Sequence, residues 1–153
     1  MLEKMDNIRP YKITDSDACL RLFDGNMPRF FDRSERSSFQ QFLTGFIQQY
    51  NVIERDGRIV ACGGHVVQSD NETASLCCGM VDQNLHGQGL GRRLMEARLT
   101  AISASGGISR VTLGTSQHTK QFYLRFGFVP VDVTPDGYGP GIDRWNMVLL
   151  LKV

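Results

Sequence analysis

Three glycines at alternate positions, Gly87, Gly89 and Gly91, form the part of this sequence whose residue types most directly suggest chemistry. They follow a strand-like apolar segment and precede a segment with helical periodicity. Glycine lacks a Cβ, so it adopts positive φ angles and lets a ligand approach the backbone closely. The start of a helix presents unpaired N–H groups and a partial positive charge, which together favour a phosphate. The spacing therefore predicts an anion-binding turn over residues 86–92, to which the Arg92 side chain adds positive charge.

Two common phosphate-binding loops do not fit this spacing. A P-loop ends in Gly-Lys-Ser/Thr, whereas Gly91 is followed by Arg92 and Arg93. A dinucleotide-binding fingerprint needs a glycine three residues after its second one, and that position is Arg92 here. A glycine-rich helix start that binds no anion is the alternative that the turn alone leaves open.

A second candidate motif follows, with the pair Phe122-Tyr123 ahead of the pair Gly127-Phe128. A tyrosine hydroxyl, whose pKa is about 10, can protonate a departing thiolate whose own pKa is about 8.5. Tyr123 is therefore the candidate general acid. The alternative is that Tyr123 packs as one more aromatic residue of a short helix, beside Phe122 and Phe126.

The two motifs together resemble those of the GCN5-related N-acetyltransferase (GNAT) superfamily. The family's pyrophosphate signature, Gln/Arg-x-x-Gly-x-Gly/Ala after a strand, is matched by residues 86–91, with His86 in the first position. Its Asn-x-x-Ala-x-x-Phe-Tyr-x-x-x-Gly-Phe block is matched by residues 116–128, with Ser116 and Thr119 in place of the Asn and the Ala. The resemblance follows the order of elements along the whole chain.

The resemblance implies an acyl-CoA N-acyltransferase fold, with acetyl-CoA as co-substrate. The chain has no CxxC pair, so no metal site is expected. The resemblance implies that backbone N–H groups near Met80 and Val81 face the thioester carbonyl, with the Val81 N–H as oxyanion donor. It also implies that Tyr123 protonates the leaving thiolate. The coenzyme-binding residues implied in this way are Met80, Val81, His86, Gly87, Gln88, Gly89, Leu90, Gly91, Arg92, Ser116 and Tyr123.

No carboxylate marks the general base in the strand where many relatives carry a glutamate, because residues 74–81 contain no Asp or Glu. His65 in the preceding strand is the candidate base, since an imidazole titrates near neutral pH. A hydrogen-bonded core histidine and the absence of a dedicated base are the alternatives. Tyr138 and Asp143 are candidates for orienting a cationic amine, and a turn-forming aspartate beside an exposed tyrosine fits the sequence equally well.

The predicted function is transfer of an acetyl group from acetyl-CoA to a primary amine by direct attack in a ternary complex. A non-catalytic acetyl-CoA-binding sensor or regulatory module is the second hypothesis, and a phosphate-binding fold unrelated to coenzyme A is the third. The acceptor is a small-molecule or peptide amine that the sequence does not identify. A homodimer is implied by the family resemblance alone.

Hydrophobic periodicity predicts the scaffold that positions these residues. Strand-like segments flank Asp56-Gly57, which indicates a two-residue hairpin turn. Glycines at Gly63, Gly64 and Gly79 indicate bulges or close backbone approaches. The predicted class is a single-domain α/β fold, a mixed, mostly antiparallel twisted sheet of about seven strands flanked by about four helices. The predicted strands are residues 8–13, 51–55, 58–68, 73–82, 108–114, 128–133 and 145–153.

Four local features complete this prediction. Thr14, with Asp17 three residues later, gives an N-cap signal for the first helix. An apolar stripe over residues 39–50 predicts one continuous amphipathic helix. In the helix after the glycine turn, Arg98 is predicted to face solvent. Residues 135–141, rich in Gly and Pro, are predicted to form a loop.

Composition sets the broad class. A chain of 153 residues with 41% hydrophobic and 22% charged residues predicts one globular domain over residues 1–153. A net charge of +1 offers no basic surface for nucleic acid. The N-terminus lacks a signal-peptide pattern and no apolar run is long enough for a membrane span, so a cytoplasmic protein is expected. The four cysteines are expected to be reduced and structural, with Cys77 and Cys78 on opposite faces of a strand.

Overall fold

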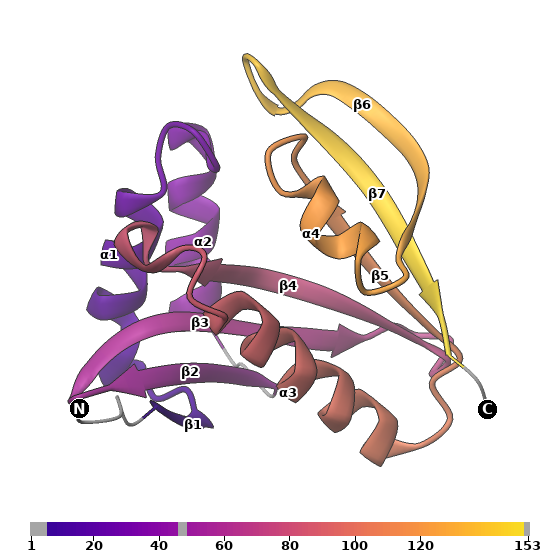
Figure 1. The fold of residues 1–153 in the computed structure, drawn as a ribbon, viewed down its shortest axis with the longest axis horizontal. Helices are drawn as coiled ribbons and strands as arrows, with labels where there is room; N and C mark the ends of the chain where they lie inside the picture. The colour runs from indigo at the N-terminus through magenta and orange to yellow at the C-terminus, as the bar shows by residue number, and fades with distance from the viewer. Residues whose placement is uncertain (1–5, 46–48, 152–153) are drawn as a thin grey trace.

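The computed structural model describes residues 6–45 and 49–151 of the chain. The strands are β1 (Asp6–Pro10), β2 (Tyr50–Arg55), β3 (Arg58–Val67), β4 (Thr73–Val81), β5 (Arg110–Thr115), β6 (Val129–Gly139) and β7 (Ile142–Leu150). The α-helices are α1 (Ser16–Gly25), α2 (Arg36–Thr44), α3 (Leu90–Ser105) and α4 (Lys120–Leu124). The strands form one sheet in the order β1-β2-β3-β4-β5-β7-β6 (Figure 1). Of the strand pairs in the described part of the chain, only β4 and β5 are parallel, which confirms the predicted mixed, mostly antiparallel fold.

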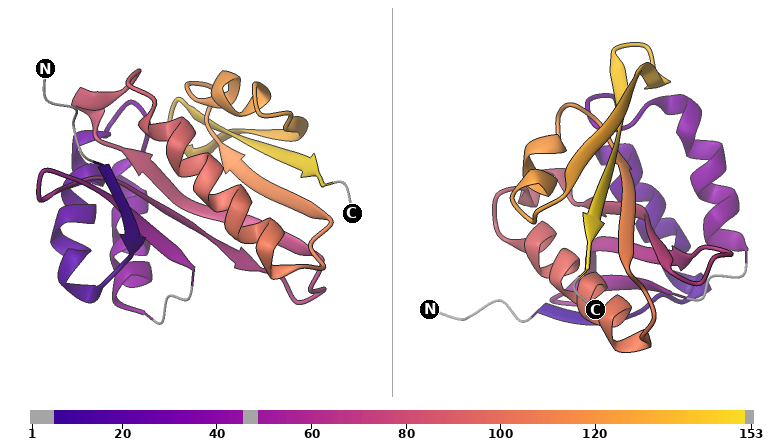
Figure 2. Two further views of the ribbon diagram at one scale, coloured as in Figure 1. Left: turned by 60° about the horizontal axis from the view of Figure 1, so that its bottom comes forward. Right: turned by 90° about the vertical axis from the view of Figure 1, so that its right-hand side faces the viewer.

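Helices cover both faces of the sheet. α1 and α2 lie on one face, and α3 and α4 lie on the other (Figure 2). Between α1, α2 and the sheet, the buried core includes Phe23, Phe39, Leu43, Val52 and Cys62. On the opposite face the core includes Met95, Ile102, Val111, Phe128 and Met147. Because the central strands are covered on both sides, they are apolar over much of their length, which is the pattern of a sheet between two helical layers.

The sheet separates between its two parallel strands. β4 pairs with β5 only from Thr73 to Ser75, opposite Arg110 to Thr112. The remaining part of β4 diverges from β5 toward the glycine turn (Figure 1). Backbone groups of β4 beyond Ser75 therefore have no neighbouring strand on the β5 side, and the gap between the strands is where the cavities described below lie.

The predicted turn and bulges are confirmed. β2 and β3 are joined by Asp56 and Gly57, with φ of 52° and 78°, as a two-residue hairpin turn requires. The register between β3 and β4 shifts between Cys62 and Gly64, opposite a stretch of β4 in which Cys78 has a φ of 47°. This bulge turns the Cys78 side chain so that it lines the same cavity as Cys77. The prediction that these two side chains lie on opposite faces was therefore wrong.

The beginnings and ends of the first two helices differ from their prediction. α1 begins at Ser16 after a 3-10 turn, in which the Asp15 carboxylate accepts a hydrogen bond from the Lys12 N–H at 2.9 Å. Asp15 and not Thr14 is thus the N-cap residue of α1, and its side chain bonds back to the start of the 3-10 turn and not to α1. α2 ends at Thr44, because Gly45 leaves the helical conformation, and Tyr50 begins β2. The predicted continuous helix was too long, and its positions 46–48 lie outside the described residues.

Two further predictions are corrected. Residues 135–139 continue β6, so the connection to β7 is a turn at residues 140–141 and the predicted loop is largely strand. Arg98 is 3% exposed, although it was predicted to face solvent. Leu94, Arg98 and Ile102 lie four residues apart in α3, so they share the helix face that packs on the sheet.

Candidate active site

The glycine turn forms an open backbone surface at the start of α3. Gly87 and Gly89 have φ of 81° and 83°, values that side chains with a Cβ adopt only under strain. Gly89 is the N-cap of α3, and no side chain caps the helix there. A Cβ at either glycine would meet no atom within 4 Å, so the turn faces free space. Unpaired helix N–H groups beside free space can receive a phosphate.

A cavity of about 430 Å³, here called the turn cavity, extends from this turn along the end of β4. Its lining includes eight of the predicted coenzyme-binding residues, namely Met80, Val81, His86, Gly87, Gly89, Gly91, Arg92 and Tyr123. The other three do not line it. Gln88 accepts a hydrogen bond from Arg55 at 3.2 Å, Leu90 is 2% exposed in the core, and Ser116 accepts a hydrogen bond from the His118 N–H.

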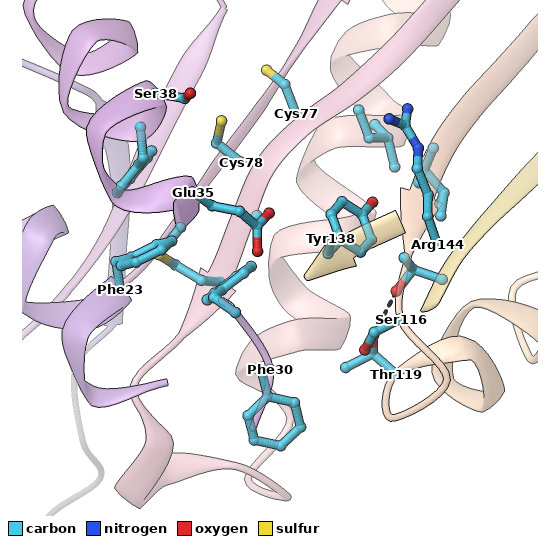
Figure 3. Close-up of a pocket in the computed structure, with 18 of the residues that line it drawn as sticks. Phe23, Phe30, Glu35, Ser38, Cys77, Cys78, Ser116, Thr119, Tyr138 and Arg144 are labelled. Atoms are coloured by element: carbon cyan, nitrogen blue, oxygen red, sulfur yellow. Dashed lines mark hydrogen bonds between the residues drawn. The ribbon is translucent and has the colours of Figure 1, made fainter. Parts of the chain in front are cut away.

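A second cavity of about 630 Å³, here called the hairpin cavity, lies between the start of α2 and the β6–β7 hairpin (Figure 3). Polar side chains from several elements line it: Ser34, Glu35, Ser38, Cys77, Cys78, Arg98, Thr115, Ser116, Thr119, Tyr123, Tyr138 and Arg144. Its apolar wall includes Phe23, Phe31, Phe39, Leu76 and Leu113. Both volumes fall within the range of about 300–1,000 Å³ that is usual for small-molecule sites.

The two cavities meet where β4 and β5 separate. Gly79 and Met80 of β4, with Thr119 and Tyr123 from the α4 segment, line both of them. The Tyr123 ring is held edge-to-face by Phe122 and Phe128, at centroid distances of 5.1 Å and 6.0 Å. A molecule in the turn cavity and another in the hairpin cavity can therefore meet beside the Tyr123 side chain.

Glu35 is a candidate site residue that the sequence did not reveal as functional. It is the one carboxylate among the described residues that line either cavity. Its carboxylate accepts a hydrogen bond from the Asp32 N–H at 2.9 Å, while Asp32 accepts one from the Ser34 N–H. Burial raises the pKa of Glu35 above its ordinary value. The Asp32-x-x-Glu35 spacing is a capping-box pattern, and it was the available signal that this side chain turns back toward its own helix start.

Arg98 occupies space created by two glycines. A Cβ at Gly63 would lie 2.9 Å from its guanidinium carbon, and a Cβ at Gly79 would lie 2.6 Å from its Nη2. Nη2 donates a hydrogen bond to the Cys77 carbonyl oxygen at 2.9 Å. Nε is buried and has no hydrogen-bond partner within residues 6–45 and 49–151. The guanidinium thus lies under the bulge of β4 and lines both cavities.

The two predicted acceptor-binding residues are separated by the structure. Tyr138 lines the hairpin cavity, and burial raises its pKa to about 12, so its hydroxyl is a hydrogen-bond donor at neutral pH. The Arg144 guanidinium lies 5.7 Å from the Tyr138 ring centroid. Asp143 lines neither cavity, since its carboxylate accepts the Asp136 N–H at 3.0 Å within the hairpin.

His65 is not brought to the junction of the cavities. It is 6% exposed on β3, opposite Leu76, and it lines neither cavity. Burial and the positive charge of Arg98 lower its pKa, so the imidazole is neutral at physiological pH. This geometry supports the alternative of a core histidine.

Replacing His65 with Asn should leave the pH dependence of kcat/KM unchanged, because the side chain has no access to a bound amine. We expect some loss of stability from the smaller buried side chain, visible as a lower Tm. Rates measured across pH for both proteins provide the check. If one pH-dependent part of the kcat/KM profile disappeared in the variant, His65 would be the general base.

Within the described ranges, no group of three or more His, Cys, Asp or Glu side chains is arranged to hold a metal ion. No helix in that part of the chain is long and apolar enough to cross a membrane.

A sequence model of the acetyltransferase (GNAT) domain matches residues 20–151. The amino-acid acetyltransferase of Pseudomonas putida is 31% identical over 94 residues, which make up 61% of this chain and 21% of that protein. The chain therefore spans about a fifth of the length of the curated relatives that it matches.

Solved structures share the fold at low sequence identity. Ard1 from Thermoplasma volcanium is 18% identical, with a TM-score of 0.81 over 97% of this chain and 99% of that one. The ribosomal-protein-S18-alanine N-acetyltransferase of Escherichia coli is 20% identical, with a TM-score of 0.77 over 97% and 96%. N-acetylglutamate synthase from Neisseria gonorrhoeae, complexed with coenzyme A and N-acetyl-glutamate, is 17% identical, with a TM-score of 0.75 over 99% and 36%.

Proposed function

Since the chain belongs to the acetyltransferase (GNAT) domain family, and is an acyltransferase by that membership, we propose that it moves the acetyl group of acetyl-CoA directly to the amine of an acceptor. The observation that carries this proposal is the meeting of two cavities at Tyr123. Direct transfer requires both substrates to be bound at once, with their reacting atoms in contact. The turn cavity receives the coenzyme and the hairpin cavity receives the acceptor.

The fit of the coenzyme rests on three features of the chain. The open N–H groups around Gly87 and Gly89 suit the pyrophosphate. The Arg92 side chain, which is largely exposed and lines the turn cavity, adds positive charge there. The β4 backbone beyond Ser75 has no strand on its β5 side, so the extended pantetheine arm can lie beside it in the manner of an added strand.

Acetyl-CoA supplies a thioester whose carbonyl carbon bonds to the amine nitrogen while the carbon–sulfur bond breaks and the electron pair leaves on sulfur. Glu35, in the hairpin cavity, takes the proton that the amine nitrogen must lose. The Tyr123 hydroxyl gives a proton to the departing sulfur. The backbone N–H at the end of β4, near Met80 and Val81, faces the carbonyl oxygen on which negative charge develops.

A catalytic carboxylate and a catalytic phenol are expected of an enzyme and not of a sensor that only binds the coenzyme. Glu35 in the hairpin cavity, which Tyr123 also lines, therefore supports catalysis over the sensor hypothesis. The test is release of free thiol from acetyl-CoA in the presence of a panel of amines, including polyamines, peptides with a free N-terminus and amino acids. Absence of release with every class would reject the proposal.

Tyr123→Phe should lower kcat by roughly 100-fold and change the KM for acetyl-CoA little, because the ring still packs on Phe122 and Phe128 while the proton donor is lost. Tyr11→Phe is the matched control, since its hydroxyl donates to the Leu43 carbonyl at 2.8 Å and Tyr11 lines neither cavity. The control should lose stability and keep kcat. An unchanged kcat in Tyr123→Phe would mean that the thiolate leaves without this acid.

A further inference from the structure

The hairpin cavity contains charges of both signs on facing walls. Glu35 comes from the turn before α2, and Arg144 comes from β7, with Tyr138 between the two (Figure 3). Arg144 is close enough for its positive charge to act on the Glu35 carboxyl. Its Nε donates to the Asn146 side chain at 3.1 Å. Within residues 6–45 and 49–151, no carboxylate lies within ion-pair distance of Arg144.

A second guanidinium makes the lining net positive. Arg98 is 3% exposed, and its Nε has no hydrogen-bond partner in the described part of the chain. The charged side chains that line the cavity are thus Arg98 and Arg144 against Glu35. Arg98 is the buried member of this pair, and a buried charge without a counter-charge is costly, as is a buried donor without an acceptor. Arg144 is solvent-exposed, so its guanidinium is accessible to an anion that enters the cavity. An anionic group on the bound acceptor would compensate the excess positive charge.

The cavity is closed on one side by its own chain. Gly139, at the tip of the β6–β7 hairpin, lies so close to Asp32 that a Cβ at position 139 would collide with the Asp32 carboxylate. The hairpin tip and the segment before α2 therefore touch next to the lining residues Ser34, Glu35 and Tyr138. This contact limits the cavity on that side, which favours a small free molecule over a segment of a folded protein.

We propose, on the basis of the N-acetyltransferase function proposed above, that the acceptor is a free α-amino acid. Its carboxylate is held by the Arg144 guanidinium, a geometry that allows two parallel hydrogen bonds. Its amine lies at Glu35, which lines the same cavity as Tyr123. Its side chain lies against the apolar wall, to which Phe31, Leu76 and Leu113 contribute.

The experiment compares each common L-α-amino acid with its α-carboxamide, which keeps the amine and the side chain and removes the negative charge. Calorimetric titration of the enzyme in the presence of coenzyme A measures binding without turnover, and thiol release from acetyl-CoA measures transfer. We expect at least one amino acid to bind at least 10-fold more tightly than its amide and to be acetylated with a higher kcat/KM.

Arg144→Gln should weaken binding of that amino acid by about 10- to 100-fold and leave the affinity for its amide unchanged. Arg110→Gln is the matched control, since Arg110 is exposed on β5 next to β7 and lines neither cavity. The control should change neither affinity.

Two results would overturn the inference. One is that the α-carboxamides bind and react as well as the amino acids. The other is that Arg144→Gln lowers the affinity for the amino acid and for its amide equally. If amines without a carboxylate are acetylated efficiently, the N-acetyltransferase proposal stands and only the amino-acid inference fails. If amino acids bind through Arg144 and no thiol is released, the binding site stands and the proposed reaction fails.

Discussion

Gly89→Glu should weaken acetyl-CoA binding by more than 100-fold. Gly89 has a φ of 83° at the N-cap of α3, where a residue with a Cβ is disfavoured by about 1 kcal/mol. The larger effect comes from the new carboxylate, which would compete for the same N–H groups as the pyrophosphate and repel it. A negative charge at a helix start stabilises the helix, so the loss of binding should not reflect unfolding of α3.

Gly106→Glu provides a matched control for this variant. Gly106 ends the same helix, has a φ of 72°, and likewise has open space where a Cβ would lie. Its φ of 72° and ψ of 154° lie in a region populated almost only by glycine, so its backbone penalty is at least as large, yet it lines neither cavity. Calorimetric titration of both variants with acetyl-CoA should therefore distinguish the effect of backbone strain from that of competition between the new carboxylate and the pyrophosphate. Equal affinities in Gly89→Glu and Gly106→Glu would show that the pyrophosphate is bound elsewhere.

The parts of the site that the sequence predicted are those that depend on local chain geometry. The φ angles at Gly87 and Gly89 and the start of α3 follow from residues next to one another in the chain. The Asp56-Gly57 turn is local in the same sense, and it was also predicted. Strands and helices of strong periodicity were found for this reason, and the order of elements along the chain followed from them.

The parts of the site that the sequence did not predict depend on which strands are neighbours in the sheet and over how many residues they stay paired. Arg98 is buried because Gly63 and Gly79, from two different strands, leave space for its guanidinium. Arg98 lies four residues after Leu94 and four before Ile102, on the helix face that packs on the sheet, whereas the sequence prediction had placed it on the solvent face. The separation of β4 from β5 after Ser75, which creates the junction of the cavities, has no marker in either strand alone.

The general base illustrates the same limit. Residues 74–81 contain no carboxylate, so His65 in the preceding strand was the predicted base. The structure brings a carboxylate from the opposite side, from the 3-10 turn Arg33–Glu35 ahead of α2. The sequence does not reveal this arrangement, because Glu35 and the residues of the β6–β7 hairpin that line the same cavity are about 100 positions apart in the chain. They come together only when α2 and the hairpin have packed.

Glu35→Gln should lower kcat/KM by roughly 100-fold without loss of stability. The glutamine keeps an oxygen that can accept the Asp32 N–H, so the turn before α2 is retained, while the group that takes the proton from the amine is lost. The wild-type kcat/KM should rise with pH as the Glu35 carboxyl ionises, above its ordinary pKa because burial raises it. That limb of the profile should be absent from the variant.

The direction in which Glu35→Gln changes the stability distinguishes a general base from a residue that only stabilises the fold. Because the pKa of Glu35 is higher in the folded protein than in the unfolded chain, the folded state binds its proton more tightly. The resulting stabilisation is present below the unfolded pKa and is lost as the pH rises through the folded value, so at neutral pH the ionised group favours unfolding. Removing its charge should leave Tm equal or higher at pH 7.

Glu54→Gln is the control variant, and its expected effects on rate and stability are the reverse of those of Glu35→Gln. Glu54 accepts a hydrogen bond from Arg9 at 3.1 Å and lines neither cavity, so its replacement should lower stability by less than about 1 kcal/mol and keep kcat/KM. A carboxylate retained at a cost in stability, and needed for the rate, is the behaviour expected of a catalytic base. If Glu35→Gln kept both the rate and the pH limb, the amine would lose its proton to water, and Glu35 would be a capping residue alone.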